Sequence, residues 1–435
     1  MKGVPRPLVL LAASAGLAAI CTMACSNHSS AATAGSRYDT RFATETAPPA
    51  IARRHVLTWA YWGQSGEDPT LGASWLAAHV DYIETNPTLA TRFRSAGGKY
   101  AVVYTDPFRV IVARNEPFSD VPENGWFHTE TGERVGRQFG GWGVQNLLNP
   151  AAPATVSAFA ALTRSFTQRF PGVFTHVFVD DVSWDTLNVF YGANARGVEA
   201  SDDAAYDRAV GELLQRSALP VFFNGLGNQD AHLHDVSGGT VFLNYAAGGV
   251  HEGCFFNVRG ARTGDEWRFD ENTLLYATSR GKDAVCLDNT SAASSVAART
   301  YFLPSWWLTF DAAHSMAFEN LPSPGNVKVF PEEALVPADP KQTANANVDE
   351  LKTASGAYAR QFGACYKDGA LLGACAAVVN PSASATVEMP SWVHAYSKVL
   401  TLDANNSFDG GQARFSAGIP SELEPQHGVI VLRPH

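Results

Sequence analysis

Short apolar runs of the kind that form buried β-strands alternate with helical stretches through residues 55–318. This alternation is typical of a parallel sheet wrapped by helices, because parallel strands need a long crossover connection. Eight such runs over this length match the usual size of a closed (β/α)8 TIM barrel. We therefore predict an α/β fold with strands at 55–62, 80–84, 99–106, 174–181, 220–224, 240–245, 283–289 and 314–318, and helices at 156–170, 204–217 and 293–310.

The pattern changes after Pro324, where short alternating segments are separated by turn residues such as Asp409-Gly-Gly411. Alternation with period two and frequent turns predicts antiparallel strands. We expect a TIM-barrel domain over 51–325, followed by a linker and a small antiparallel β-sandwich domain over 326–435. The segments that carry this prediction are 358–362, 376–381, 392–402, 413–416 and 429–432.

The N-terminal residues have the composition of an export signal. Lys2 and Arg6 precede an apolar and small-residue run over 7–21, which is too short for a comfortable membrane span. Cleavage before Cys25 would give a lipoprotein with a lipid anchor on this residue, whereas Ala32-Thr-Ala34 offers an ordinary cleavage site. We expect a signal peptide over 1–25, a flexible tether over 26–50, and an exported protein: an outer-membrane lipoprotein, periplasmic or secreted.

The cysteine pattern agrees with export. Cys21 and Cys25 are removed or lipidated, which leaves an even number in the mature chain and favours disulfides. One of the remaining four follows the sixth candidate strand and one lies in the seventh, its neighbour in a barrel. The other two flank a hairpin-type turn at 367–369. The predicted pairs are Cys254–Cys286 and Cys365–Cys375.

Several functional classes lack support in the sequence. A net charge of −10 without a run of Lys or Arg argues against nucleic-acid binding. Glycine-rich nucleotide loops and the serine-hydrolase elbow are absent, so we expect no cofactor. The single His-x-His, His232-Leu-His234, falls in a polar stretch after the fifth candidate strand rather than at the end of the first, so we expect no metal site.

Polar residues end most of the candidate strands, and in a parallel barrel the working residues come from these ends. Carboxylates at one rim suit glycosidic hydrolysis, which needs one carboxyl group as an acid and another as nucleophile or base. An Asp at a strand end can also simply cap the next helix, which is the alternative for single residues. The candidates are Asp106, Asp180, Asp181, Asn224, Glu252, Asp288 and Glu319.

The adjacent pair Asp180-Asp181 is the strongest of these signals, because two neighbouring carboxylates repel each other and make a poor cap. Side chains alternate along a strand, so only one of the pair points into the barrel mouth. We favour Asp180, which shares a face with Phe178. Asp181 is then expected to orient its neighbour or to cap the following helix.

Aromatic residues are frequent, with 10 Trp and 13 Tyr beside 17% charged residues. Many of them cluster near the expected rim, at the end of the first strand and in the long Gly-rich segment 107–148. A loop this long usually carries function. We predict a sugar-binding cleft lined by Trp59, Tyr61, Trp62, Trp126 and Trp142. For Trp59 and Tyr61 the alternative is packing in the barrel core.

Three segments together resemble a group of uncharacterised bacterial glycoside hydrolases with barrel folds. They are His176-Val-Phe-Val-Asp-Asp-Val-Ser183, Gly249-Val-His-Glu-Gly-Cys-Phe255 and the β-rich tail. More distantly, the chain is similar to dextranase-type and endo-polygalactosaminidase-type enzymes. The resemblance implies a nucleophilic Asp after strand four and an acidic Glu after strand six, which map to Asp180 and Glu252. The glycine usual before strand four is displaced to Gly172, which leaves Asp181 open as the nucleophile.

These observations predict a glycoside hydrolase that acts on an extracellular or envelope polysaccharide or oligosaccharide. The alternative is a barrel lipoprotein that binds carbohydrate without cleaving it. For hydrolysis, Asp180 must stay ionised, with Asn224 as a hydrogen-bond donor. Glu252 must stay protonated, which needs a drier setting that raises its pKa, with His251 and Tyr245 expected to shape that setting.

Overall fold

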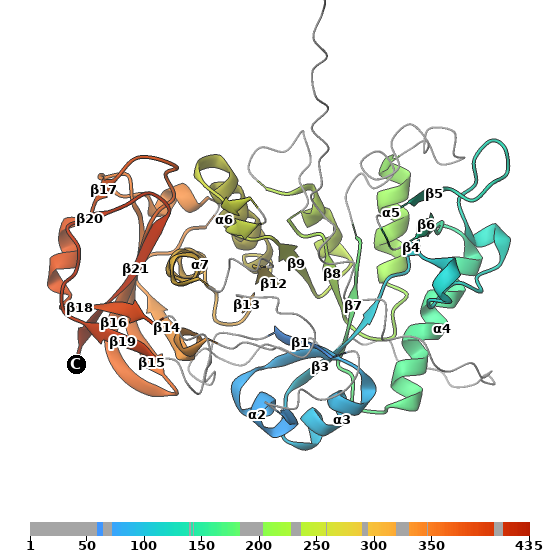
Figure 1. The fold of residues 1–435 in the computed structure, drawn as a ribbon, viewed down its shortest axis with the longest axis horizontal. Coiled ribbons are helices and arrows are strands. Elements are labelled where there is room, and N and C mark those ends of the chain that lie inside the picture. The colour runs from blue at the N-terminus through green and yellow to red at the C-terminus, as the bar shows by residue number, and fades with distance from the viewer. Residues whose placement is uncertain are drawn as a thin grey trace, which may run out of the picture.

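A computed structural model describes residues 59–63, 72–138, 141, 143–182, 203–227, 236–257, 259–288, 295–318, 330–345, 347–403 and 412–435. Its central element is an eight-stranded parallel sheet that curls in the manner of a TIM barrel (Figure 1). In spatial order its strands are β1 (Trp59–Gly63), β2 (Tyr82–Thr85), β3 (Tyr100–Thr105), β7 (His176–Val179), β8 (Val221–Asn224), β9 (Gly248–Glu252), β12 (Asp283–Leu287) and β13 (Ser315–Phe318).

Helices connect most of the neighbouring strands, as the sequence predicts for an α/β fold. The edge strands β1 and β13 approach each other, so that the sheet is strongly curled. Within the ranges given above, no helix has the length and apolar character needed to cross a membrane. The helices are α2 (Gly72–His79), α3 (Pro87–Ser95), α4 (Pro153–Arg169), α5 (Asp203–Leu214), α6 (Gly264–Thr278) and α7 (Val296–Leu308).

The sixth strand lies later in the chain than predicted. The apolar run 240–245 belongs to a 3-10 helix, η7 (Gly238–Asn244), and the strand is β9. The sequence does not indicate β9 because it begins with two glycines, a residue type that is unfavourable in strands. These glycines are needed here because there is no room for a side chain. A Cβ atom on Gly248 would lie 2.8 Å from the Phe222 ring, and one on Gly249 would lie 2.8 Å from the Phe223 ring.

Both predicted disulfides are present. Cys254, two residues beyond β9, is bonded to Cys286 of β12. Cys365 and Cys375 join the two strands of the hairpin formed by β15 (Tyr358–Lys367) and β16 (Ala370–Asn380). The hairpin turns at Asp368 and Gly369, both with positive φ. Each disulfide therefore links strands that are neighbours in a sheet.

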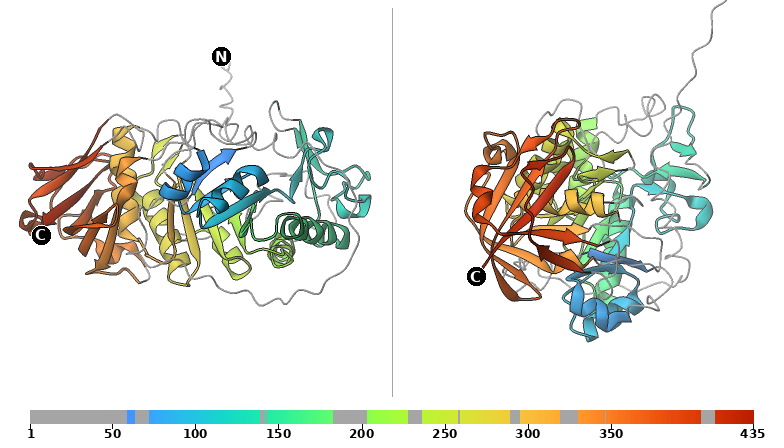
Figure 2. Two further views of the ribbon diagram at one scale, coloured as in Figure 1. Left: turned by 90° about the horizontal axis from the view of Figure 1, so that it is seen from below. Right: turned by 60° about the vertical axis from the view of Figure 1, so that its left-hand side comes forward.

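The long segment after β3 folds as an excursion from the central sheet. It contains a small antiparallel sheet of β4 (Arg109–Val110), β6 (Val144–Leu147) and β5 (Gly136–Gln138). In Figure 2 this excursion and α4 lie at one end of the molecule, and the C-terminal sheet lies at the other. The excursion is thus a folded segment that begins at the carboxyl end of β3.

The C-terminal part forms antiparallel sheets, as the alternating segments predict. A six-stranded sheet has the order β14 (Leu335–Pro340), β15, β16, β21 (His427–Pro434), β18 (Lys398–Leu402), β19 (Ala413–Ser416). One face packs on α7. A small core cluster on the other face includes the two-stranded ribbon β17 (Val387–Glu388) and β20 (Glu422–Leu423) and the 3-10 helix η11 (Ser391–Ala395).

Helix α7 is shared by the parallel and antiparallel parts. On one side Phe302 packs edge-on against Phe255, which follows β9. On the other, Trp307 packs edge-on against Phe362 of β15. Arg360 of β15 donates hydrogen bonds to the carbonyl groups of Leu308 and Phe310, at the helix's C-terminal end. A single buried core therefore runs through both parts.

A cluster of rings fills the lower interior of the curled sheet. The His176 ring lies 4.9 Å from Phe222, 5.7 Å from Tyr82 and 5.9 Å from Tyr100, measured between ring centroids. Only 7% of His176 is exposed. Because a charged imidazole is poorly solvated there, burial lowers the pKa of His176 from 6.5 to about 4.

This buried imidazole predicts acid sensitivity of the fold. The unfolded chain binds a proton at His176 near pH 6.5 and the folded chain near pH 4. The contribution of His176 to stability should therefore be complete above pH 6.5 and should fall by about 3 kcal/mol as the pH drops to 4. His176→Phe, measured by urea unfolding at several pH values, should flatten this limb. His394→Gln, at an exposed position, is the control; an unchanged slope in His176→Phe would contradict the prediction.

Candidate functional site

Three polar side chains form one hydrogen-bonded chain across the carboxyl ends of β7, β8 and β9. The Asn224 amide nitrogen donates to Asp180 Oδ1 at 2.9 Å and to Glu252 Oε2 at 2.7 Å. Asn224 and Glu252 end their strands, and Asp180 directly follows β7. The structure thus brings the two carboxyl groups favoured by the sequence onto a single nitrogen between them.

The carboxylate of Asp180 is held from three directions. Besides Asn224, the Tyr104 hydroxyl donates to its Oδ2 at 2.9 Å, and the backbone N–H of Asp181 donates to its Oδ1 at 2.8 Å. Tyr104 belongs to β3, whose register places it beside Phe178 of β7. Donors from three strand ends fix the orientation of this side chain before any ligand binds. The prediction that Asp180 faces inward with Phe178 agrees with these contacts.

Asp181 has a different environment from its neighbour. Its backbone is in the left-handed region, with φ of 59°, which turns the chain sharply away from β7. Its carboxylate pairs with Arg109 of β4, and the two side chains are 16% and 11% exposed. The excursion is therefore tied to the site through a largely buried ion pair. This geometry favours a supporting role for Asp181.

Replacing Asp181 should be milder than replacing Asp180. Asp181→Asn keeps a residue type that tolerates left-handed backbone but removes the charge partner of Arg109. We expect turnover to fall by about tenfold or less, against at least about 100-fold for Asp180→Asn. Asp181→Val should instead lower the melting temperature, because a β-branched residue strains this conformation. Steady-state rates that rank Asp181→Asn below Asp180→Asn would reverse the assignment.

Two further carboxyl groups lie beside Asp180. Glu84 of β2 is 4% exposed, and burial, reinforced by the negative charge of Asp180, raises its pKa well above the usual value. Burial also raises the pKa of Asp106 to about 7, against the opposing effect of Arg109. Asp106 accepts hydrogen bonds from the backbone N–H groups of Phe108 and Arg109. Asp106 therefore closes a turn into β4 rather than capping a helix, which is the alternative considered from the sequence, and it lies near enough to Asp180 to be affected by its charge.

Sequence reasoning missed Glu84 and Tyr104. Glu84 ends the run 80–84, and the rule that selected the other carboxylates also applies to it. Tyr104 lies two residues before Asp106, on the same face of β3, so strand alternation was the available signal. Glu84 Oε2 is buried without a hydrogen-bond partner among the described residues. The site therefore has more acidic groups than the sequence analysis assigned.

The predicted role of Trp126 in sugar binding is wrong. The side chain is 3% exposed, and its indole nitrogen donates to the Val121 carbonyl at 2.9 Å. The guanidinium of Arg134 lies over the ring at 4.1 Å. A buried ring whose face is already covered cannot stack on a sugar. Trp126 is part of the hydrophobic core of the excursion.

The expected influence of His251 and Tyr245 on Glu252 is also corrected. His251 alternates with Glu252 along β9 and points to the opposite face, where its ring contacts α6. The Tyr245 ring packs against Gly211 of α5, so closely that a Cβ there would lie 2.5 Å from it. Neither side chain lines the interior beside Glu252. Strand alternation explains the error for His251.

The remaining candidates are only partly described. Asp288 is buried directly after β12. Trp142 and Glu319 lie outside the described residues, as do His232 and His234. Trp59, Tyr61 and Trp62 belong to β1, and their side chains lie outside the described part of the structure. In the ranges that the structure covers, no group of three His, Cys, Asp or Glu side chains is arranged to hold a metal ion.

Comparison with known proteins gives distant structural likenesses. No protein-family model matches the chain, and no curated protein matches it in sequence. The glycoside hydrolase domain of PelA from Pseudomonas aeruginosa is similar over 61% of this chain and 95% of its own, with 15% identity and a TM-score of 0.41. The maltogenic α-amylase AmyB from Thermotoga neapolitana is similar over 88% of this chain and 99% of its own, with 10% identity and a TM-score of 0.39.

An α-galactosidase from Thermus thermophilus is similar over 55% of this chain and 59% of its own, with 16% identity and a TM-score of 0.32. All three are glycoside hydrolases by description.

Proposed function

We propose that the protein is a glycoside hydrolase whose two working carboxyl groups are Asp180 and Glu252. The observation that carries this proposal is the Asn224 amide, which bonds to both. Hydrolysis of a glycosidic bond needs an acid for the leaving oxygen and a second carboxylate on the anomeric carbon. Two carboxyl groups on one bridging nitrogen at a barrel rim satisfy that requirement with side chains that are already oriented.

Within this proposal Asp180 is the nucleophile and Glu252 the general acid. Asp180 suits the first role because three donors hold it, leaving its orientation fixed for attack. Both carboxyl groups accept a hydrogen bond from the same Asn224 nitrogen, at 2.9 and 2.7 Å, so their nearest oxygens lie close together, as in the closely spaced pairs of retaining enzymes. We therefore propose retention of anomeric configuration. Burial and the charge of Asp180 raise the pKa of Glu84, which favours the neutral form of this carboxyl group.

The same proposal extends to the whole chain. We propose a (β/α)8 barrel over 51–325 and a β-sandwich over 326–435, behind a signal peptide and a tether. The protein is exported, as a lipoprotein on Cys25 or in free form, and meets its polysaccharide or oligosaccharide outside the cytoplasm. Trp59, Tyr61, Trp62 and Trp142 remain the proposed sugar-stacking residues, with polar contacts from Asp106, Asp288 and Glu319.

A panel of neutral and amino polysaccharides tests the activity. Purified protein should release new reducing ends from at least one member, and proton NMR of the first products should show the substrate's own anomeric configuration. Asp180→Asn should abolish release. Binding without release would favour the carbohydrate-binding alternative, and an inverted first product would refute the assignment of Asp180 as nucleophile.

A further inference from the structure

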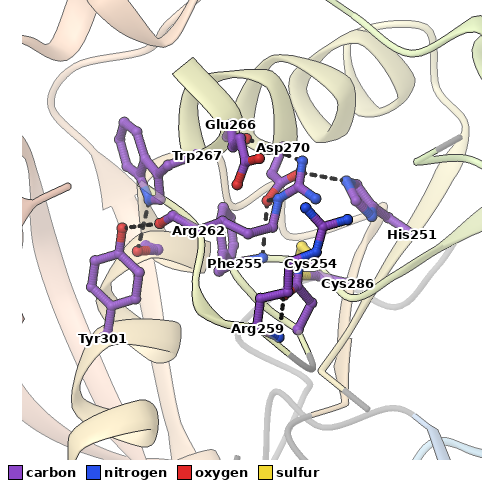
Figure 3. Close-up of polar contacts among 12 residues, drawn as sticks. His251, Cys254, Phe255, Arg259, Arg262, Glu266, Trp267, Asp270, Cys286 and Tyr301 are labelled. Atoms are coloured by element: carbon purple, nitrogen blue, oxygen red, sulfur yellow. Dashed lines mark hydrogen bonds and ion pairs between the residues drawn. A yellow bond between two sulfur atoms is a disulfide. The ribbon is translucent and has the colours of Figure 1, made fainter. Parts of the chain in front are cut away.

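The strand that carries Glu252 also carries a buried histidine on its opposite face. His251 is 1% exposed and Glu252 is its immediate neighbour in β9. Glu252 accepts a hydrogen bond from Asn224. The His251 ring instead points toward Asp270 of α6 (Figure 3). Any group that fixes the position of His251 therefore also fixes the strand end on which Glu252 stands.

Asp270 of α6 is that group. Its carboxylate is fully buried and accepts from three places: His251 Nε2 at 2.7 Å, the backbone N–H of Phe255 at 3.0 Å, and an ion pair with Arg262 at 2.7 Å (Figure 3). In sequence, one partner precedes Glu252 and two follow it. A single carboxylate thus holds the chain on both sides of the proposed acid.

The turn after Glu252 has a conformation that needs such support. Gly253 and Phe255 both have positive φ, of 76° and 59°. This left-handed backbone costs about 1–3 kcal/mol at Phe255. A residue keeps such a conformation only where several surrounding contacts hold it in place. The Phe255 N–H group that this conformation presents is the one that Asp270 accepts.

The other backbone hydrogen bonds and the disulfide that tie the turn to the sheet lead to β12. The backbone N–H groups of Gly253 and Cys254 donate to the Leu287 carbonyl, and Cys254 is joined to Cys286. These contacts fix the turn along the sheet, but none of them reaches across to α6. Asp270 supplies this second direction, so polar contacts hold the turn to both β12 and α6, in addition to the packing of the Phe255 ring on Phe302 of α7.

We infer that Asp270 is the positioning residue for the general acid, acting through His251 and the Phe255 N–H group to hold Glu252 at the leaving-group oxygen. This rests on the proposed function. Misplacing an acid by about 1 Å can cost about 100-fold in rate. Asp270 does not touch the substrate itself, since it lies on the outer side of β9, against α6.

The first test measures the turn directly and needs no substrate. In hydrogen–deuterium exchange of the full chain, Asp270→Asn should speed exchange of peptide 253–257 by at least about tenfold, because Asn loses the charge that these donors share. Asp265→Asn is the matched control, an exposed residue on the same helix that pairs only with Arg268 among the described residues. Unchanged exchange in Asp270→Asn would overturn the inference.

The second test uses the leaving group. General acid catalysis matters most when the departing oxygen is a poor leaving group, so a misplaced acid should spare activated substrates. With phenyl and 2,4-dinitrophenyl glycosides of the sugar that the panel identifies, Asp270→Asn should lose about 10- to 100-fold in kcat/KM on the phenyl substrate and much less on the dinitrophenyl substrate. The ratio kcat/KM is the measure because it reports the first step, in which Glu252 acts as the acid, whereas kcat also includes the later step in which the same residue acts as a base. A merely structural defect would lower both rates together.

Glu252→Gln in the same assay separates the two proposals. If it shows the leaving-group pattern and Asp270→Asn does not, the inference about Asp270 fails while the proposed function stands. If Glu252→Gln shows no such pattern, the proposed role of Glu252 fails, whatever exchange shows. Should Asp270→Asn not fold, His251→Ala and His251→Gln replace it: only Gln retains an N–H group that can reach Asp270, so only Gln should preserve the wild-type pattern.

Discussion

Asp180→Asn and Glu252→Gln are each expected to reduce turnover by at least about 100-fold while leaving the melting temperature nearly unchanged. Both substitutions keep the size of the side chain, and both positions are only partly buried, so the fold should tolerate them. What they remove is the charge or the proton that the reaction needs. Initial rates on the polysaccharide found by the panel, with circular dichroism melts of the same preparations, measure the two effects.

The two variants should also differ in kind. Asp180→Asn should lose activity on every substrate, because no covalent intermediate can form. Glu252→Gln should retain activity on glycosides whose leaving group needs no proton. Asp265→Asn serves as the control for removal of a carboxylate from the surface. Full activity of both site variants on a confirmed substrate would remove the site from this rim of the sheet.

Removing one partner of the buried Arg299–Glu332 ion pair is expected to destabilise the fold by about 3–5 kcal/mol. Both side chains are fully buried, with two contacts of 2.5 and 2.7 Å between guanidinium and carboxylate. Arg299 lies in α7 and Glu332 in the 3-10 helix η9 (Pro331–Ala334), which leads into β14. Glu332→Gln leaves the guanidinium charge buried without its counter-charge, which is the main cost.

Guanidinium chloride unfolding at pH 7 measures this loss. Arg268→Gln is the matched control, since Arg268 pairs with Asp349 across the same junction but with side chains 38% and 39% exposed, where about 1 kcal/mol or less is expected. The double variant Arg299→Met with Glu332→Leu should lose less than either single change, because a hydrophobic pair replaces a buried charge. If Glu332→Gln lowers the free energy of unfolding by less than about 1 kcal/mol, the ion pair does not stabilise the contact between α7 and the segment that leads into β14.

The sequence predicts well those strands whose residues are apolar simply because the strand is buried. The run 174–181 is apolar because β7 is buried on both faces, and its polar end marks the rim. The same logic located Asn224, whereas Glu252 was singled out by the resemblance of its segment, Gly249-Val-His-Glu-Gly-Cys-Phe255, to a family motif. This logic failed for the run 240–245, since apolar residues suit a buried 3-10 helix equally well, and for β9, whose glycines make room for the rings of Phe222 and Phe223.

Helix α6 was missed for a related physical reason. Its middle residues Asp270, Glu271, Asn272 and Thr273 are polar and buried, so the helix has no alternating apolar face to detect. Each instead bonds to another element: Asn272 accepts from the Val348 backbone, and Glu271 accepts from Thr309. Such pairings depend on residues far apart in the chain. The assignment of Trp126 failed likewise, because a loop's own core cannot be foreseen from its length.

The sharing of α7 between the two sheets has a consequence for how such a chain can evolve. Phe302 and Trp307 face different sheets from one helix, so each sheet is built against a surface that the other also needs. Recombination at a linker could therefore not replace the C-terminal sheet by itself, because the surface of α7 on which this sheet packs would remain with the other part. A different C-terminal module at this place would therefore need a matching face on α7.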